Sequence, residues 1–156
     1  DTMNFWMDNA LAELMKVIKR VDIIIINDEE ALQLSKKDTL FAAANEILSF
    51  GPKQIVIKKG EHGAMLFDES QFFTVPAFPV KKVIDPTGAG DTFAGGFAGY
   101  LSQLDNINFE VMKLAVVHGT VMASFCVEGF GTSVMESLEK ETTNNRLKEF
   151  KNFTRY

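Results

Sequence analysis

Residues 83–96 read V-I-D-P-T-G-A-G-D-T-F-A-G-G, a glycine-rich turn followed by an apolar segment that suits a helix. The first N–H groups of a helix have no partner within it, and the helix dipole favours negative charge there, so the turn suits an anion. Asp91 stands at the same place. A carboxylate beside an anion site fits phosphoryl transfer to a hydroxyl. The amides of Gly88, Ala89 and Gly90 would hold the transferring phosphoryl group, and Asp91 would accept the proton as general base.

Simpler explanations of this stretch must be weighed beside that one. Asp is a preferred N-cap residue, so Asp91 could serve only to cap a helix. A Walker A loop requires Lys and then Ser or Thr after its last glycine, and neither follows Gly90. The dinucleotide-binding fingerprint requires a third glycine where Phe93 stands. A capped helix and a phosphoryl-transfer site therefore remain as interpretations.

Hydrophobic periodicity predicts the elements that must position this turn. A helix is expected over 6–19 from its helical spacing of apolar residues, and a buried strand over 23–26 from its run of isoleucine. Further strands are expected over 54–58, 64–67, 72–75 and 81–84, and helices over 28–34, 91–103, 109–127 and 135–153. Ser35-Lys36-Lys37-Asp38 is similar to a capping box and predicts another helix, which ends at Gly51-Pro52.

This order of elements predicts an α/β layer fold with a mostly parallel central sheet. The glycine-rich turn then lies at the carboxyl ends of the strands, where such sheets bind ligands. The 156 residues are enough for one α/β domain with a sizeable core. Residues 1–156 are therefore expected to form a single α/β domain.

Composition narrows the class of protein. A net charge of −5 argues against nucleic acid as the main partner. The single cysteine, Cys126, lies in an apolar segment and fits a core thiol in a reducing cytoplasm. The longest apolar run, 111–127, contains Lys113 and His118 and is interpreted as a buried helix, so no membrane partner is expected.

Three stretches together resemble the ribokinase-like (PfkB) family of carbohydrate and nucleoside kinases. Residues 85–93 with Gly95-Gly96-Phe97 look like its C-terminal signature, Asn27-Asp28-Glu29-Glu30 looks like its N-x-x-E motif, and residues 55–64 look like its strand–turn–strand. The resemblance implies a three-layer ribokinase-like fold with a mostly parallel sheet. It also implies that the chain is the C-terminal, ATP-binding half of a longer kinase, because the family's N-terminal half carries much of the sugar-binding surface and the lid.

The same resemblance implies roles for residues that the pattern alone leaves open. It places Asn27 on the nucleotide side, makes Glu30 hold Mg²⁺ through water, and makes Asp85 the charged ligand of a monovalent cation such as K⁺. It brings Lys58, Gly60, Glu61 and Gly63 along the nucleotide and His118 to the adenine pocket. Each has a plainer alternative: a capped helix for Asn27 and Glu30, amides that satisfy Asp85, an ordinary hairpin for 58–63, and a core histidine for His118.

The resemblance implies an ATP- and Mg²⁺-dependent kinase that phosphorylates a hydroxyl of a small sugar or nucleoside, with a homodimer allowed. Pro86 stands where many sugar kinases have Thr, which tilts the expectation toward nucleosides. No Arg accompanies Phe5 and Trp6, which argues against a phosphosugar. One alternative is a catalytically incomplete nucleotide-binding fragment that acts only with a missing half or a partner. Another is a hydroxymethyl-pyrimidine or vitamin kinase on a related fold.

Overall fold

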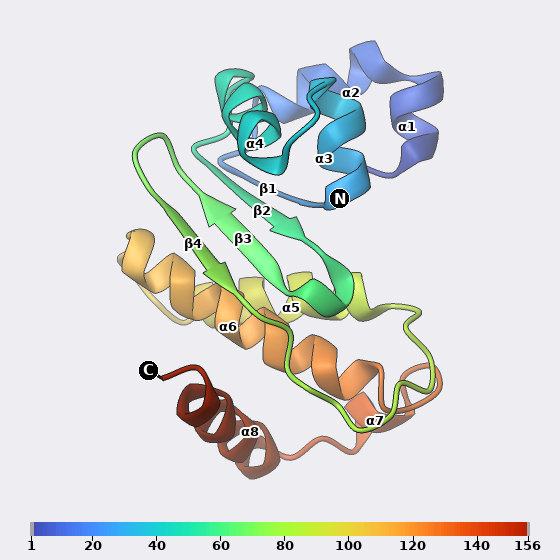
Figure 1. Ribbon diagram of the computed structural model, residues 1–156, viewed down its shortest axis with the longest axis vertical. Coiled ribbons are helices and arrows are strands. Elements are labelled where there is room, and N and C mark those ends of the chain that lie inside the picture. Colours follow the sequence, from blue (N-terminus) through green and yellow to red (C-terminus); the bar gives the residue numbers. More distant parts are fainter. Residues whose placement is uncertain (1, 156) are drawn as a thin grey trace. The chain divides into compact units, whose positions relative to one another are not determined.

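The computed structural model describes residues 2–155, which divide into two compact units. The first unit runs to Thr74 and the second begins at Val75. Figure 1 labels the helices and strands of both units.

The first unit is built on a small mixed sheet. Its strands are β1 (Ile23–Asn27), β2 (Gln54–Lys58), β3 (Ala64–Phe67) and β4 (Phe72–Val75), in the order β1-β2-β3-β4. β1 and β2 are parallel, with Ile25 opposite Val56, whereas β2 and β3 are antiparallel. The predicted α/β class is confirmed. The pairing of β1 with β2 has the predicted parallel direction, whereas the pairing of β2 with β3 does not.

Helices cover one face of this sheet (Figure 1). They are α1 (Asn4–Asn9), α2 (Leu11–Ile18), α3 (Asp28–Ser35) and α4 (Leu40–Ser49). Alternate residues of the β-branched strands point to this face and meet small and aliphatic helix residues, as expected for a sheet that buries one side. The core consists of Met7, Ile18, Ile24, Ile26, Ala31, Leu34, Ala43, Ala44, Ile47, Ile55, Ile57 and Phe67.

Two local predictions for this unit are wrong. Two helices form where one was expected over 6–19. Ala10, between α1 and α2, has φ −147° and ψ 40°, which is not helical and ends the first helix. The expected capping box at Ser35 does not form. The Ser35 hydroxyl donates to the carbonyl of Ala31 at 2.7 Å inside α3, and Thr39 caps α4 instead by accepting from Ala42 N–H at 3.3 Å.

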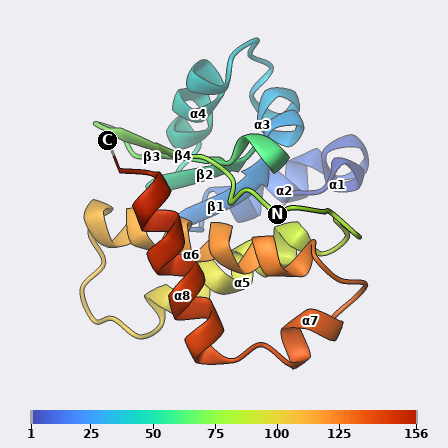
Figure 2. The same cartoon turned by 60° about the horizontal axis from the view of Figure 1, so that its bottom comes forward.

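The second unit is built on a close pair of helices, α5 (Ala89–Leu101) and α6 (Phe109–Cys126). Glycines set the closeness: a Cβ added at Gly119 would lie 2.8 Å from the carbonyl oxygen of Phe93, and one at Gly96 would lie 2.7 Å from Met122. The short helix α7 (Ser133–Glu136) leads to α8 (Lys140–Phe153), which lies across α6 (Figure 2).

Two further predictions fail in this unit. The segment 81–84 is not a strand; Ile84 N–H instead donates to the carbonyl of Val127, just after α6, at 2.8 Å. The helix expected over 135–153 is α7 and α8, separated by Ser137, Leu138 and Glu139.

Helix α6 is long and apolar enough, by length and composition, to cross a membrane. However, 56% of that apolar window is buried inside the structure, as in the core helix of a soluble protein. The interpretation of this segment as a buried helix therefore agrees with its packing.

Candidate functional site

The glycine-rich loop (residues 85–91) of the second unit has a backbone that its glycines permit. Gly88 is the N-cap of α5 and has φ 80°, in the left-handed region. Residues other than glycine are strained in this conformation. A Cβ on Gly88 would also point at the Cys126 sulfur, 3.9 Å away. The left-handed turn is therefore what requires glycine at position 88, since 3.9 Å is an ordinary van der Waals contact.

This loop leaves backbone donors free at the start of α5. Thr92 N–H donates to the carbonyl of Gly88 at 2.8 Å, and Ala89 N–H donates to the carbonyl of Pro86 at 3.1 Å. Within residues 2–155, the N–H groups of Gly88, Gly90 and Asp91 donate no hydrogen bond. The sequence predicted free amides at Gly88, Ala89 and Gly90. The structure uses the Ala89 amide inside the turn and leaves that of Asp91 available.

Asp91 lies in the first turn of α5, not at its N-cap. Its side chain is exposed, and it forms no hydrogen bond or ion pair within the described part of the chain. The N-cap explanation of Asp91 therefore does not account for its position. An uncommitted carboxylate at the positive end of a helix dipole is available to a ligand.

Asp85 is held by the backbone around it. Its Oδ1 accepts from Thr87 N–H at 2.9 Å, and its own N–H donates to the carbonyl of Val127 at 3.4 Å. The Thr87 N–H holds the pKa of the Asp85 carboxyl below its ordinary value, and the Thr87 hydroxyl and Gly131 N–H lower it further. The plainer alternative for Asp85, satisfaction by neighbouring amides, describes this geometry.

Asn27 and Glu30 of the first unit form a complete capping box at the start of α3. Asn27 Oδ1 accepts from Glu30 N–H at 2.7 Å, and Glu30 Oε2 accepts from Asn27 N–H at 2.9 Å. Glu30 is 3% exposed. The capped-helix alternative thus holds for both residues, and any role with a ligand is additional to it.

The turn between β2 and β3 carries the other candidates of the first unit. Lys58 ends β2 and lies opposite Asn27 of β1 in the parallel register, so the carboxyl ends of the two strands meet. Gly60 has φ 54° and open space where a Cβ would be, and Gly63 has φ 89°. Glu61 is exposed. The backbone of this turn is therefore open to a ligand at Gly60.

His118 lies on α6 and stacks on Tyr100 of α5, with ring centroids 4.2 Å apart and planes inclined by 22°. Burial lowers the pKa of His118. The imidazole is therefore neutral at neutral pH, and it presents an uncharged aromatic ring with one nitrogen donor and one nitrogen acceptor.

The structure therefore gathers the predicted residues into local groups. Asn27, Glu30 and Lys58 meet at the strand ends of the first unit, whereas Asp85 and Gly88–Asp91 form the loop of the second. No group of three or more His, Cys, Asp or Glu side chains in residues 2–155 could hold a metal ion. The sequence analysis missed the carbonyl of Val127 and the amide of Gly131, because backbone groups leave no signal in residue type.

Comparison with known proteins identifies the family. Residues 3–139 match the model of the pfkB family carbohydrate kinase. The chain belongs to this family. The predicted resemblance to this family is confirmed. Curated relatives of the chain have several activities.

Two of these relatives illustrate the range of their activities. A cytidine kinase from Thermococcus kodakarensis is 42% identical over 56% of this chain and 32% of its own length. A deoxyribokinase from Salmonella typhi is 36% identical over 79% of this chain and 40% of its own length. The pfkB chain thus spans less than half the length of these relatives.

Solved structures agree with the fold. Aminoimidazole riboside kinase from Salmonella enterica, complexed with aminoimidazole riboside and an ATP analog, is 25% identical with a TM-score of 0.78, covering 90% of this chain and 47% of that one. Ribokinase from Thermotoga maritima is 30% identical with a TM-score of 0.74, covering 86% and 44%. The ribokinase-like fold predicted from the sequence is confirmed.

Proposed function

We propose that this chain forms the ATP-binding portion of a kinase that transfers the γ-phosphoryl group of ATP to a hydroxyl of a small sugar or nucleoside. One observation carries the proposal: the start of α5 offers the free N–H groups of Gly88, Gly90 and Asp91 beside the uncommitted Asp91 carboxylate. Free donors bind phosphate oxygens, and the carboxylate can take a proton. Neither group is needed to complete the local fold.

In the proposed reaction, the acceptor hydroxyl lies between Asp91 and the γ-phosphorus. Asp91 takes the proton as the acceptor oxygen bonds to phosphorus, the bond from phosphorus to the β–γ bridging oxygen breaks, and ADP leaves with that electron pair. The three amides stabilise charge on the transferring oxygens. Ala89 contributes its small side chain, which keeps the backbone accessible.

The nucleotide is proposed to lie along Asn27, Lys58, Gly60, Glu61 and Gly63, with His118 at the adenine. The open backbone at Gly60 and the strand-end position of Asn27 and Lys58 support this surface. A putative ribokinase II from E. coli, 27% identical with a TM-score of 0.71, was solved in complex with ATP and Mg²⁺. Mg²⁺ keeps several waters and needs one or two carboxylates plus phosphates, so Glu30 alone suits it better than a site made only of protein ligands.

Asp85 is proposed to serve a monovalent cation such as K⁺. Its low pKa keeps the carboxylate charged at any physiological pH, and hard cations prefer carboxylate and carbonyl oxygens. The relatives that act on nucleosides and on sugars support a small-molecule acceptor of either class. We place the activity in the cytoplasm, where ATP and such acceptors occur together.

The test is ADP release from Mg·ATP by the complete polypeptide, with cytidine, other nucleosides, deoxyribose, ribose and fructose as acceptors. Turnover on one acceptor that is lost in Asp91→Asn would support the kinase and name its substrate class. Near-wild-type turnover in Asp91→Asn would overturn the assignment of the base.

The proposed alternative is a nucleotide-binding portion that is inactive without further sequence. The span of this chain, less than half of the relatives' length, motivates it. ATP binding by the isolated chain without turnover on any acceptor would favour this alternative. Turnover by the chain alone would exclude it.

A further inference from the structure

Arg146 of α8 is the centre of a cluster that reaches across the second unit. Its Nη2 lies 2.7 Å from Glu128 Oε2, and its Nη1 donates to Ser124 Oγ at 3.0 Å. Its guanidinium lies over the ring of Phe125, 3.6 Å from the centroid, and 4.9 Å from the centroid of Phe78. The Arg146 side chain is 18% exposed, so these contacts are largely shielded from water. The Glu128 side chain is 32% exposed. A guanidinium that makes several charge-assisted contacts is held more firmly than a single exposed ion pair.

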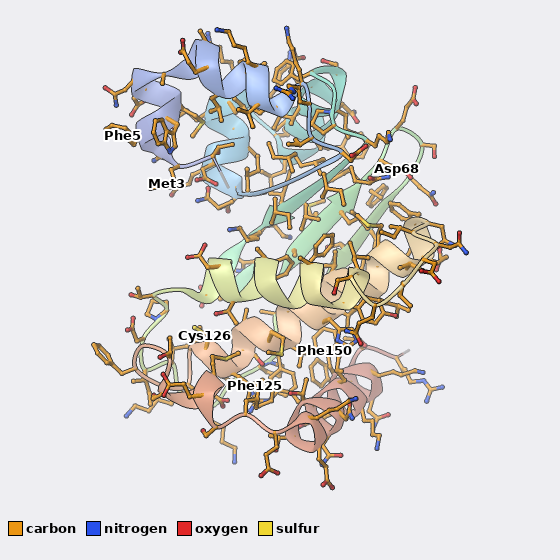
Figure 3. All side chains as sticks on the ribbon, turned by 180° about the vertical axis from the view of Figure 1, so that it is seen from behind. Met3, Phe5, Asp68, Phe125, Cys126 and Phe150 are labelled. Atoms are coloured by element: carbon orange, nitrogen blue, oxygen red, sulfur yellow. The ribbon has the colours of Figure 1, made fainter. Side chains whose placement is uncertain are left out.

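The partners of Arg146 lie on both sides of the glycine-rich loop in sequence. Phe78 precedes the loop, in the irregular segment after β4. Ser124 and Phe125 belong to the last turn of α6, which also carries Cys126 (Figure 3), and Glu128 follows two residues after the end of the helix. One side chain therefore ties the chain entering the loop to the helix end against which the loop rests.

The loop itself has few anchors. Within the described residues, the backbone hydrogen bonds that join residues 76–88 to segments other than α5 run from Ile84 and Asp85 N–H to the carbonyl of Val127, at 2.8 and 3.4 Å. The Gly131 N–H also interacts with the Asp85 carboxylate. The Cys126 thiol adds a weak bond to the carbonyl of Thr87 at 3.6 Å. Val127 and Cys126 directly precede Glu128, the residue that Arg146 holds. A shift of this turn would move the Val127 carbonyl and the Cys126 thiol, which hold Ile84, Asp85 and Thr87.

We propose that Arg146 is a positioning residue for the glycine-rich loop: through Glu128 and Phe78 it fixes the α6 end that holds Ile84 and Asp85, and thereby the amides of Gly88, Gly90 and Asp91. Its catalytic consequence rests on the proposed kinase function. Arg146 lies beyond residues 3–139, the part that the family model matches. Coupling through such a chain of packed side chains and hydrogen bonds is physically contiguous.

The experiment compares three variants of the complete polypeptide with the wild type. Arg146→Met removes the charge and keeps an apolar stem, and Arg146→Lys keeps the charge but loses the planar fork. Lys148→Met is the matched control, because Lys148 lies on the same helix, is exposed, and forms no hydrogen bond or ion pair within residues 2–155. Leu147→Ala, which removes half-buried packing from α8, controls for a general loss of stability.

The first readout is amide hydrogen exchange, which needs no activity. Arg146→Met is expected to speed exchange of the Ile84 and Asp85 amides about tenfold relative to α5 and α6, with Arg146→Lys intermediate and both controls close to wild type. Unchanged exchange at these amides would overturn the proposal. So would a uniform rise across the unit, or an equal local rise in Leu147→Ala.

The second readout is steady-state kinetics. Arg146→Met is expected to lower kcat about tenfold and change the KM for the acceptor less than about twofold, because misplaced catalytic groups cost rate more than ground-state binding. Unchanged kcat in an active wild type would overturn the positioning role. An inactive wild type with the expected local exchange would instead overturn the kinase proposal and leave the structural role of Arg146 supported.

Discussion

Helices α3 and α5 each carry an acidic residue three positions after the N-cap, and the two acids have opposite fates. Glu30 of α3 reaches back to Asn27 N–H, while Asn27 accepts from Glu30 N–H, so both residues are consumed by the capping box. Asp91 of α5 follows a glycine N-cap that has no side chain to offer, and its own side chain is one methylene shorter. The first helix start is self-satisfied, whereas the second leaves its donors and its carboxylate for a ligand.

The interiors of the two units also differ. The first unit buries the isoleucines of β1 and β2 beneath small helix residues, so its core depends on side-chain volume. The second unit brings the α5 and α6 backbones together at Gly96 and Gly119, so its core depends on missing side chains. The close helix pair keeps the start of α5 on a rigid element, which a phosphate site requires.

Among the substitutions that test the comparison between α3 and α5, Asp91→Asn is expected to have the largest effect. Losing a general base lowers kcat by about 100-fold or more, while the melting temperature stays near the wild-type value because Asp91 has no partner to lose. ADP release and thermal unfolding measure the two quantities. Asp105→Asn, an exposed acid after α5, is the control. A large loss of stability in Asp91→Asn would contradict the view that this carboxylate is not used by the fold.

The packing of the second unit predicts a loss of stability for Gly119→Ala. The added Cβ would lie 2.8 Å from the carbonyl oxygen of Phe93, and backbone cannot move aside cheaply. We expect the free energy of unfolding to fall by about 1–3 kcal/mol, as for other overpacked cores. Gly99→Ala is the matched control: nothing lies within 4 Å of its Cβ position, and helix propensity should make it neutral or stabilising. Equal effects of the two substitutions would disprove close packing at Gly119.

The first unit predicts a smaller effect at Glu30. Glu30→Ala breaks half of the capping box and should lower the free energy of unfolding by about 0.5–2 kcal/mol. Glu30→Gln keeps an acceptor for Asn27 N–H and should lose little. Denaturant unfolding of both variants measures this difference.

The variants Glu30→Ala and Glu30→Gln also distinguish the capping role of Glu30 from its proposed Mg²⁺ role. If the carboxylate also serves Mg²⁺, Glu30→Gln should require more Mg²⁺ for half-maximal turnover while remaining folded. An unchanged Mg²⁺ requirement in an active enzyme would assign Glu30 to the cap alone.

The smallest expected effect is the pH dependence at His118. Burial lowers its pKa in the folded state, so the folded protein binds fewer protons at this site than the unfolded one. Its contribution to stability is full above the unfolded pKa, about 6.5, and is lost as pH falls below that value. Melting temperatures between pH 7 and pH 5 should decline less in His118→Phe, which keeps an aromatic ring on Tyr100. The same decline in both proteins would show that another group carries the dependence.

Much of the architecture was predictable because it follows from local patterns. The β-branched runs of β1 and β2 and the turn at Gly60–Gly63 lie where residue type and glycine placement indicated. The failures have two causes, a long-range contact at Ile84 and a local bond at Ser35 that competes with the predicted one. Val83 and Ile84 have strand-like side chains but form no strand, and Ser35 bonds inside α3 instead of capping the next helix.

The sequence by itself determined that a glycine-rich turn precedes a helix, that an acid stands in its first turn, and that the chain has the motifs of the pfkB family. These depend on backbone freedom, helix-end electrostatics and residue order, all of which are local. Residue type does not show which amides stay free, because that depends on the backbone conformation of the turn: Ala89 N–H donates to the carbonyl of Pro86, and Asp91 N–H has no acceptor within residues 2–155. Only the tertiary structure decided that the carbonyl of Val127 and the side chain of Arg146 support the loop, because these long-range contacts arise only when distant segments pack together.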